Sequence, residues 1–156
     1  EIIHKGRVTM SEVKRNLLKD IGIQTPVREI DSNTWGHISM KIDLSEGFIR
    51  EFQDHVYWNY ISSYQKLSEE FIREFEDKID WDRIPASQIL SDEFILEFNG
   101  RIDWELYFYY AAGSYPIMKK FISKTSYRSS LEFKSRHLNE NQKREINKIL
   151  ELKNIF

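Results

Sequence analysis

The sequence repeats itself with a period of 23 residues, and this feature limits the folds open to it more than any other. A unit of this length cannot bury an apolar face by itself, so repeated units stack on one another to make a continuous core. Residues of one type at the 23-residue interval are Trp35, Trp58, Trp81, Trp104, Ser45, Ser68, Ser91, Ser114, Phe52, Phe75, Phe98 and Phe121.

Three stretches of the chain are near copies of one another: 44–58, 67–81 and 90–104. The stretch 114–127 is a decayed fourth copy, with Ile117 at the position of Phe48 and Tyr127 at the position of the tryptophan. Copies of this length and similarity indicate duplication of one structural unit.

Each unit is predicted to be a short helical hairpin. Ser45, Ser68 and Ser91 stand where an N-cap is expected, and acidic residues follow them in the first turn. A second, shorter helix is expected after each tryptophan, and Pro85 fits its first turn if that helix begins near Asp82. The apolar face predicted for the unit 67–81 consists of Phe71, Ile72, Phe75 and Ile79, and the predicted anchors of the shorter helices are Ile61 and Ile84.

The predicted fold is all-α: a short solenoid-like array of 23-residue hairpins within one domain, 1–156. Residues 1–33 and 128–156 are the predicted capping segments, and 34–127 hold four to five repeats. In the N-terminal segment we expect a helix over 11–22, with Ser11 as its cap and Gly22 as its stop, while Ile2–Thr9 is left open between a strand and an ordered tail. At the other end we expect a helix over 139–152, capped by Asn139, with Ile146, Ile149 and Leu150 as its apolar stripe.

The amino-acid sequence of the repeat resembles that of uncharacterised repeat proteins from giant DNA viruses and large phages. The resemblance lies in the LSEEFIREF segment, the following tryptophan and the I-S-x-Y-Q pattern, and it covers about residues 35–127. It implies a viral origin and helical repeats, and it implies no catalytic residues.

Nothing in the sequence indicates an enzyme, a metal site or a cofactor. The four histidines are scattered, no phosphate-binding or nucleophile motif occurs, and the chain has no cysteine for a disulfide or a thiolate site. The lack of cysteine favours a reducing compartment, and no apolar run is long enough to span a membrane. We therefore expect a non-enzymatic binding protein in the cytoplasm, and the resemblance implies that this is the cytoplasm of an infected host cell.

Charge divides the chain into an acidic middle and a basic end. Residues 43–112 hold 6 Lys/Arg and 16 Asp/Glu, and residues 113–156 hold 10 and 4. An acidic row of this kind can imitate nucleic-acid phosphate and block a host protein, which is the first hypothesis. Its candidate partner-binding residues, with two tyrosines of the aromatic cluster 107–110, are Glu51, Glu70, Glu74, Asp77, Glu97, Tyr107 and Tyr109.

The alternative hypothesis is that the basic C-terminal region binds nucleic acid through lysine and arginine contacts to phosphate. Its candidate residues are Lys119, Lys120, Lys124 and Arg128. A further expectation concerns the core: Trp58 and Trp81 repeat in register with the apolar face, so both are predicted to be buried between successive hairpins.

Overall fold

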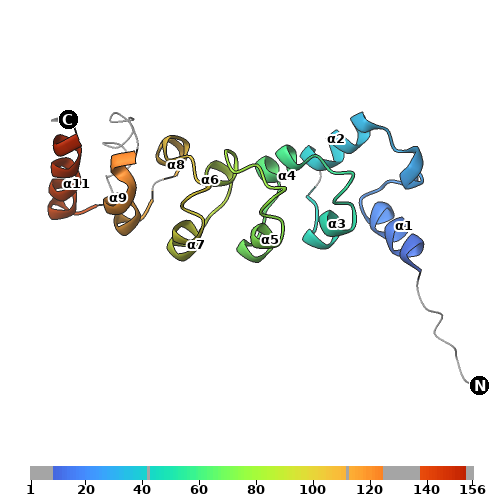
Figure 1. Cartoon of the computed structure of the whole chain (residues 1–156). Helices are drawn as coiled ribbons and strands as arrows, with labels where there is room; N and C mark the ends of the chain where they lie inside the picture. Colours follow the sequence, from blue (N-terminus) through green and yellow to red (C-terminus); the bar gives the residue numbers. More distant parts are fainter. Residues whose placement is uncertain (1–8, 42, 112, 125–137, 154–156) are drawn as a thin grey trace, which may run out of the picture. The chain divides into compact units, whose positions relative to one another are not determined.

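All regular structure in the described residues is helical, so the predicted all-α class is confirmed. The computed structural model describes residues 9–41, 43–111, 113–124 and 138–153 (Figure 1). No strand occurs in those ranges, and the N-terminal strand is not supported, because Thr9 caps a helix and residues 2–8 lie outside the described part. The helices are α1 (Met10–Asp20), η1 (Val27–Glu29), α2 (Ser32–Lys41), α3 (Glu46–Glu51), α4 (Trp58–Tyr64), α5 (Glu69–Glu74), α6 (Ile84–Ser87), α7 (Asp92–Glu97), α8 (Trp104–Tyr110), α9 (Tyr115–Phe121), η2 (Ile122–Lys124) and α11 (Glu140–Lys153).

The chain forms two compact units, residues 1–66 and residues 67–156. The prediction of a single domain with two capping segments stays a prediction. The boundary lies between Lys66 and Leu67, where the second near copy of the repeated sequence begins.

The repeated serines cap α3, α5 and α7, as the sequence predicts. The Ser45, Ser68 and Ser91 hydroxyls accept hydrogen bonds from backbone N–H groups three residues later, and Ser114 does the same for α9. These bonds satisfy N–H groups that have no partner within the helix. Pro85 lies in the first turn of α6, although that helix begins at Ile84, later than predicted.

The cap of the N-terminal helix lies two residues before the predicted one, so the prediction of Ser11 as cap is wrong. The cap is Thr9, which forms a capping box with Glu12: each residue's side chain bonds the other's backbone N–H, at 3.3 and 2.7 Å. Gly22 does end the helix, at φ +80°, with hydrogen bonds from Gly22 N to Lys19 O and from Ile23 N to Leu18 O. At the C-terminal end Asn139 forms the predicted cap, through a reciprocal pair of bonds with Gln142.

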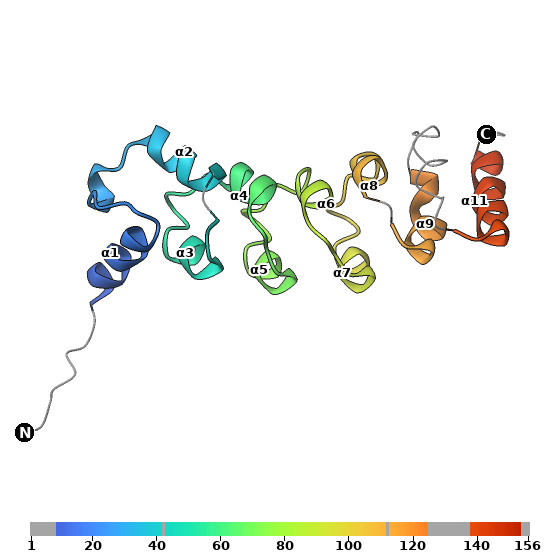
Figure 2. The ribbon, with the colours of Figure 1, turned by 180° about the vertical axis from the view of Figure 1, so that it is seen from behind.

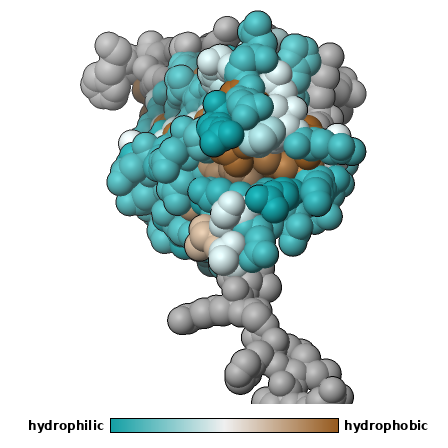
Figure 3. Space-filling model, turned by 90° about the vertical axis from the view of Figure 1, so that its right-hand side faces the viewer, coloured by the Kyte–Doolittle hydropathy of each residue, from teal (hydrophilic) through white to brown (hydrophobic). Residues whose placement is uncertain are grey.

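In the unit 1–66, α2 packs against α4, and an ion pair between Lys14 and Glu51 joins α1 to α3 at 3.4 Å. Figure 2 shows the same helices from behind. Beside α1, a hollow of about 490 Å³ opens between this helix and the segment that leads into η1. Figure 3 looks onto this unit, where hydrophobic surface is surrounded by hydrophilic side chains. The core of the unit consists of Leu18, Trp35, Ile38, Leu44, Phe48, Ile49, Phe52, Val56 and Ile61.

In the unit 67–156, α6 packs against α8 and α7 packs against α9, while α5 lies beside α7 (Figures 1 and 2). The predicted apolar face of α5 is buried, since Phe71 and Ile72 are 0% exposed. Ile146 of α11 is also buried, and Ile149 and Leu150 pack beside it, which confirms the predicted C-terminal stripe. The cluster at this end of the unit consists of Ile95, Ile102, Trp104, Tyr107, Phe108, Ile117, Met118, Phe121, Ile122, Leu138 and Ile146.

The tryptophans do not all have the predicted burial. Trp58 and Trp81 are only half-buried, whereas Trp35 and Trp104 are 4% and 6% exposed. The indole N–H of Trp58 donates to Gln53 O at 3.0 Å, and that of Trp81 donates to a carbonyl five residues earlier at 2.9 Å. These bonds hold the N–H edge at a surface turn, so full burial was the wrong prediction for both residues.

Candidate functional site

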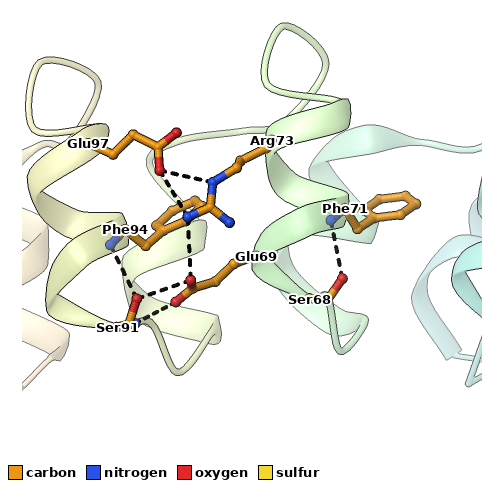
Figure 4. Close-up of polar contacts among 7 residues, drawn as sticks. All are labelled: Ser68, Glu69, Phe71, Arg73, Ser91, Phe94 and Glu97. Atoms are coloured by element: carbon orange, nitrogen blue, oxygen red, sulfur yellow. Dashed lines mark hydrogen bonds and ion pairs between the residues drawn. The ribbon is translucent and has the colours of Figure 1, made fainter.

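The acidic residues of α5 and α7 form a connected polar network in the unit 67–156. Arg73 lies at its centre, donating from Nε to Glu97 Oε2 at 2.9 Å and forming an ion pair with Glu69 at 3.6 Å (Figure 4). The arginine and Glu97 are 24 residues apart, so this pair joins two successive helices. The hydrogen bond to Glu97 raises the pKa of Arg73, and the carboxylates of Glu69 and Glu70 add to this effect.

A second tie in the network connects the start of α5 to the start of α7. Glu69 accepts from the backbone N–H of Ser91 at 2.6 Å and from its hydroxyl at 3.0 Å (Figure 4). Because Ser91 also caps α7, one serine serves both helices. The next pair of helices, α7 and α9, repeats the arrangement, because the Ser114 hydroxyl donates to the Asp92 carboxylate.

The guanidinium of Arg73 also lies over the ring of Phe94, 4.9 Å from its centroid. This places a cation on the face of a ring that is itself 0% exposed. At the corresponding position 23 residues later in the sequence, the arginine is replaced by Leu96, which is 38% exposed. The network therefore does not continue in the same form beyond α7.

The structure places the five predicted acidic residues in two settings. Glu51, Asp77 and Glu97 form ion pairs within the protein: Glu51 with Lys14, Asp77 with Arg101 at 3.1 Å, and Glu97 with Arg73. Glu70 and Glu74 lie exposed on α5. Asp77 remains 84% exposed at its side chain in spite of its ion pair.

The aromatic cluster of α8 is divided between the core and the surface. Tyr107 is 6% exposed, and Phe108 is fully buried. Burial raises the pKa of Tyr107 to about 12, and the Asp92 carboxylate adds to that shift. Tyr109 and Tyr110 are 48% and 56% exposed, so they are the members of the cluster that a partner can reach.

The described basic residues of the alternative hypothesis lie in two settings. Lys119 forms an ion pair with Glu145 at 2.7 Å, which raises the pKa of Lys119 and lowers that of Glu145. The Lys120 ammonium lies 5.3 Å from the Phe121 ring centroid, and that of Lys124 lies at the same distance. Arg128 lies outside the described residues.

The described part of the chain contains no group of three or more histidine, aspartate or glutamate side chains placed to hold a metal ion. No helix in that part is both long and apolar enough to cross a bilayer. Sequence reasoning found the acidic helices, but it missed the partners of their side chains. Those partners lie 22 to 24 residues away, as with Glu69 and Ser91 or Arg73 and Glu97.

The fold and this surface define an all-helical protein with an acidic, internally braced face. No family model matches the chain, and no match was found among curated proteins or among solved structures.

Proposed function

We propose that this chain is a non-enzymatic helical-repeat protein, arranged as a short solenoid, that binds another protein through the acidic side of α5 and α7. The observation that carries the proposal is the excess of exposed carboxylates on these two helices. Glu70, Glu74 and Glu93 are exposed there, and Arg73 is the one basic residue within the two helices. A negative surface of this kind attracts a positive one and speeds its association.

The internal ties support this assignment because they fix the geometry of the surface before a partner arrives. Arg73, Glu69 and Ser91 hold α5 and α7 together, so their side chains need little further ordering on binding. A preorganised surface loses less entropy on association than a mobile one. The spacing of the exposed carboxylates is thus set by the protein itself.

The resemblance to repeat proteins of giant DNA viruses and large phages supports extending the proposal to a viral protein that acts inside a host cell. In that setting, the partner is a host protein with a basic surface, such as one that grips nucleic acid. Binding to the acidic helices would then inhibit it by occupying its phosphate-binding surface.

The test is capture of partners from a host lysate, followed by mass spectrometry, with the wild-type chain and three double variants. Glu70→Lys with Glu74→Lys is expected to lose the captured protein, since it reverses the charge of two exposed residues on α5. Asp20→Lys with Glu29→Lys makes the same change in charge at exposed positions of the other unit and is the matched control. Capture that is equal for these two variants would contradict the proposal.

Lys120→Glu with Lys124→Glu tests the alternative, a nucleic-acid-binding protein that uses the basic C-terminal region. The observation that favours this alternative is the exposure of both lysines beside aromatic rings. Direct binding to DNA would weaken steeply with added salt, because counterions are released from the phosphates. We expect the wild-type chain to show no such binding at near-physiological salt.

A further inference from the structure

One glutamine of the repeat joins the end of one helix to the start of the next. Gln65 is 4% exposed, and its Oε1 accepts from the Leu44 backbone N–H at 2.9 Å. Its Nε2 donates to Ser39 O, also at 2.9 Å. Ser39 lies in the last turn of α2, and Leu44 precedes the cap of α3, so the carboxamide satisfies one backbone group at each end of the connection.

Gln88 occupies the same position in the next repeat and makes the same contact with the chain. Its Oε1 accepts from the Leu67 N–H at 3.1 Å. After a further 23 residues the position is occupied by Ala111. The residues that correspond to Ser39 and Leu44 in that repeat are Pro85 and Leu90.

A hollow of about 530 Å³ lies where the missing glutamine side chain would be. Pro85, Leu90 and Ala111 all line it, so the residues at the three matching positions meet at one place. Ile89 is fully exposed at its rim, and Tyr110 is 56% exposed. The remaining lining residues are Ala86, Gln88, Asp92, Tyr107, Gly113 and Ser114.

The larger ring of Tyr107, which replaces Ile84 of the preceding repeat, does not take up this space. Its ring lies against Gly113, where an added Cβ would come within 3.3 Å of Tyr107 Cε1. Gly113 has φ +59°, a conformation that favours glycine. The ring is therefore accommodated beside the glycine, and the hollow remains.

Two backbone groups beside the hollow have no hydrogen-bond partner among the residues that the structure describes. Within the described residues, the Leu90 N–H has no acceptor and the Pro85 carbonyl has no donor. Their counterparts at Leu44 and Ser39 are both bonded to Gln65. In the first repeat a donor and an acceptor at these positions bind the two ends of one primary carboxamide.

We propose that this hollow binds the side-chain carboxamide of a glutamine presented by a partner polypeptide. The carbonyl oxygen of that glutamine accepts from the Leu90 N–H, and its amino group donates to the Pro85 carbonyl, as Gln65 does within the chain. The exposed Ile89 and Tyr110 pack against apolar residues that flank the glutamine in the partner. The inference rests on the proposed function only in that the partner is a protein.

The test uses a small probe, N-acetylglutamine N-methylamide, titrated into the full-length chain and followed by the backbone amide signals in NMR. We expect saturable shifts of the Leu90 amide in the millimolar range. N-acetylmethionine N-methylamide has a similar length without the carboxamide, and it should bind roughly tenfold more weakly, which is the effect of one net hydrogen bond of ordinary strength. Equal affinity for the two probes would overturn the proposal.

Ala111→Gln supplies the missing side chain from within and should abolish binding of the glutamine probe. It should also raise the urea midpoint above that of Ala111→Met, because only the glutamine satisfies the Leu90 N–H. If Ala111→Gln still binds the probe as the wild type does, or gains no stability over Ala111→Met, the hollow is not a carboxamide site. These measurements need no captured partner, so they fail independently of the Glu70 and Glu74 experiment.

Discussion

Replacing Gln65 by methionine should destabilise the unit 1–66 strongly, although the new side chain is apolar and of similar length. The substitution leaves the Leu44 N–H and the Ser39 carbonyl without partners in a site where the side chain is 4% exposed. An unsatisfied buried backbone group costs about 1–3 kcal/mol, so the two together cost about 2–6 kcal/mol. That is a large part of the roughly 5–15 kcal/mol by which domains are stable.

Two measurements check this value. Urea unfolding followed by circular dichroism gives the loss of stability, and hydrogen exchange of the Leu44 amide reports the broken bond directly. Gln24→Ala is the matched control, because Gln24 is exposed in the same unit and should change stability by no more than about 0.5 kcal/mol. The reasoning is refuted if Gln65→Met has the urea midpoint and the Leu44 exchange rate of the control.

Gln65→Glu adds a pH-dependent form of the same test. The carboxylate still accepts from Leu44 but faces the Ser39 carbonyl, which it cannot hydrogen-bond unless it is protonated. Folding should therefore raise the pKa of this glutamate above its unfolded value of about 4.3. The variant gains stability relative to the wild type as the pH falls through the folded pKa, and this gain is complete below the unfolded pKa.

Three further predictions follow from other parts of the structure. Trp104→Ala should cost about 3–5 kcal/mol in urea unfolding, and Trp81→Ala distinctly less, because only the first ring is fully buried; equal losses would contradict the burial. Ser91→Ala removes the cap of α7 and should lower the free energy of unfolding by about 1 kcal/mol in the same measurement. An unchanged free energy of unfolding would contradict a stabilising role for the serine hydroxyl. Lys119 holds the pKa of Glu145 below its usual range, so this pair stabilises the fold above the unfolded glutamate pKa and the contribution is lost as the pH falls through the folded pKa. Glu145→Gln should remove that part of the acid sensitivity, and an unchanged stability–pH profile would exclude it.

The local structure of each repeat was predictable because it depends on short-range interactions. Ser45 and Ser91 cap helices since their hydroxyls reach N–H groups three residues ahead, which is visible in the sequence spacing. The prediction failed at Ser11 because Thr9 and Glu12 form a capping box that begins the helix earlier. Both residues were in the sequence, so that error was one of interpretation.

The residues of the candidate acidic surface were predictable from the sequence. Whether each carboxylate is exposed or ion-paired was not. The carboxylates of α5 and α7 follow from the repeat, whereas the choice between exposed and paired depends on which cation lies on the next helix. Arg73 reaches Glu97 and leaves Glu70 exposed, because side chains 24 residues apart meet only after α5 and α7 have come together. The spacing rules for side-chain pairs within one helix cannot predict a contact between two helices.

The sequence by itself determined the period, the helical class, the capping serines and the buried phenylalanines, because these depend on residue type and on distances of a few residues. The tertiary structure decided which tryptophans are buried, which tyrosines of α8 reach the surface, and where the chain leaves a hollow. Ala111 is an ordinary residue in the sequence. It becomes informative only when Leu90 and Pro85 are seen beside it, since an unfilled space is a property of neighbours brought together by folding.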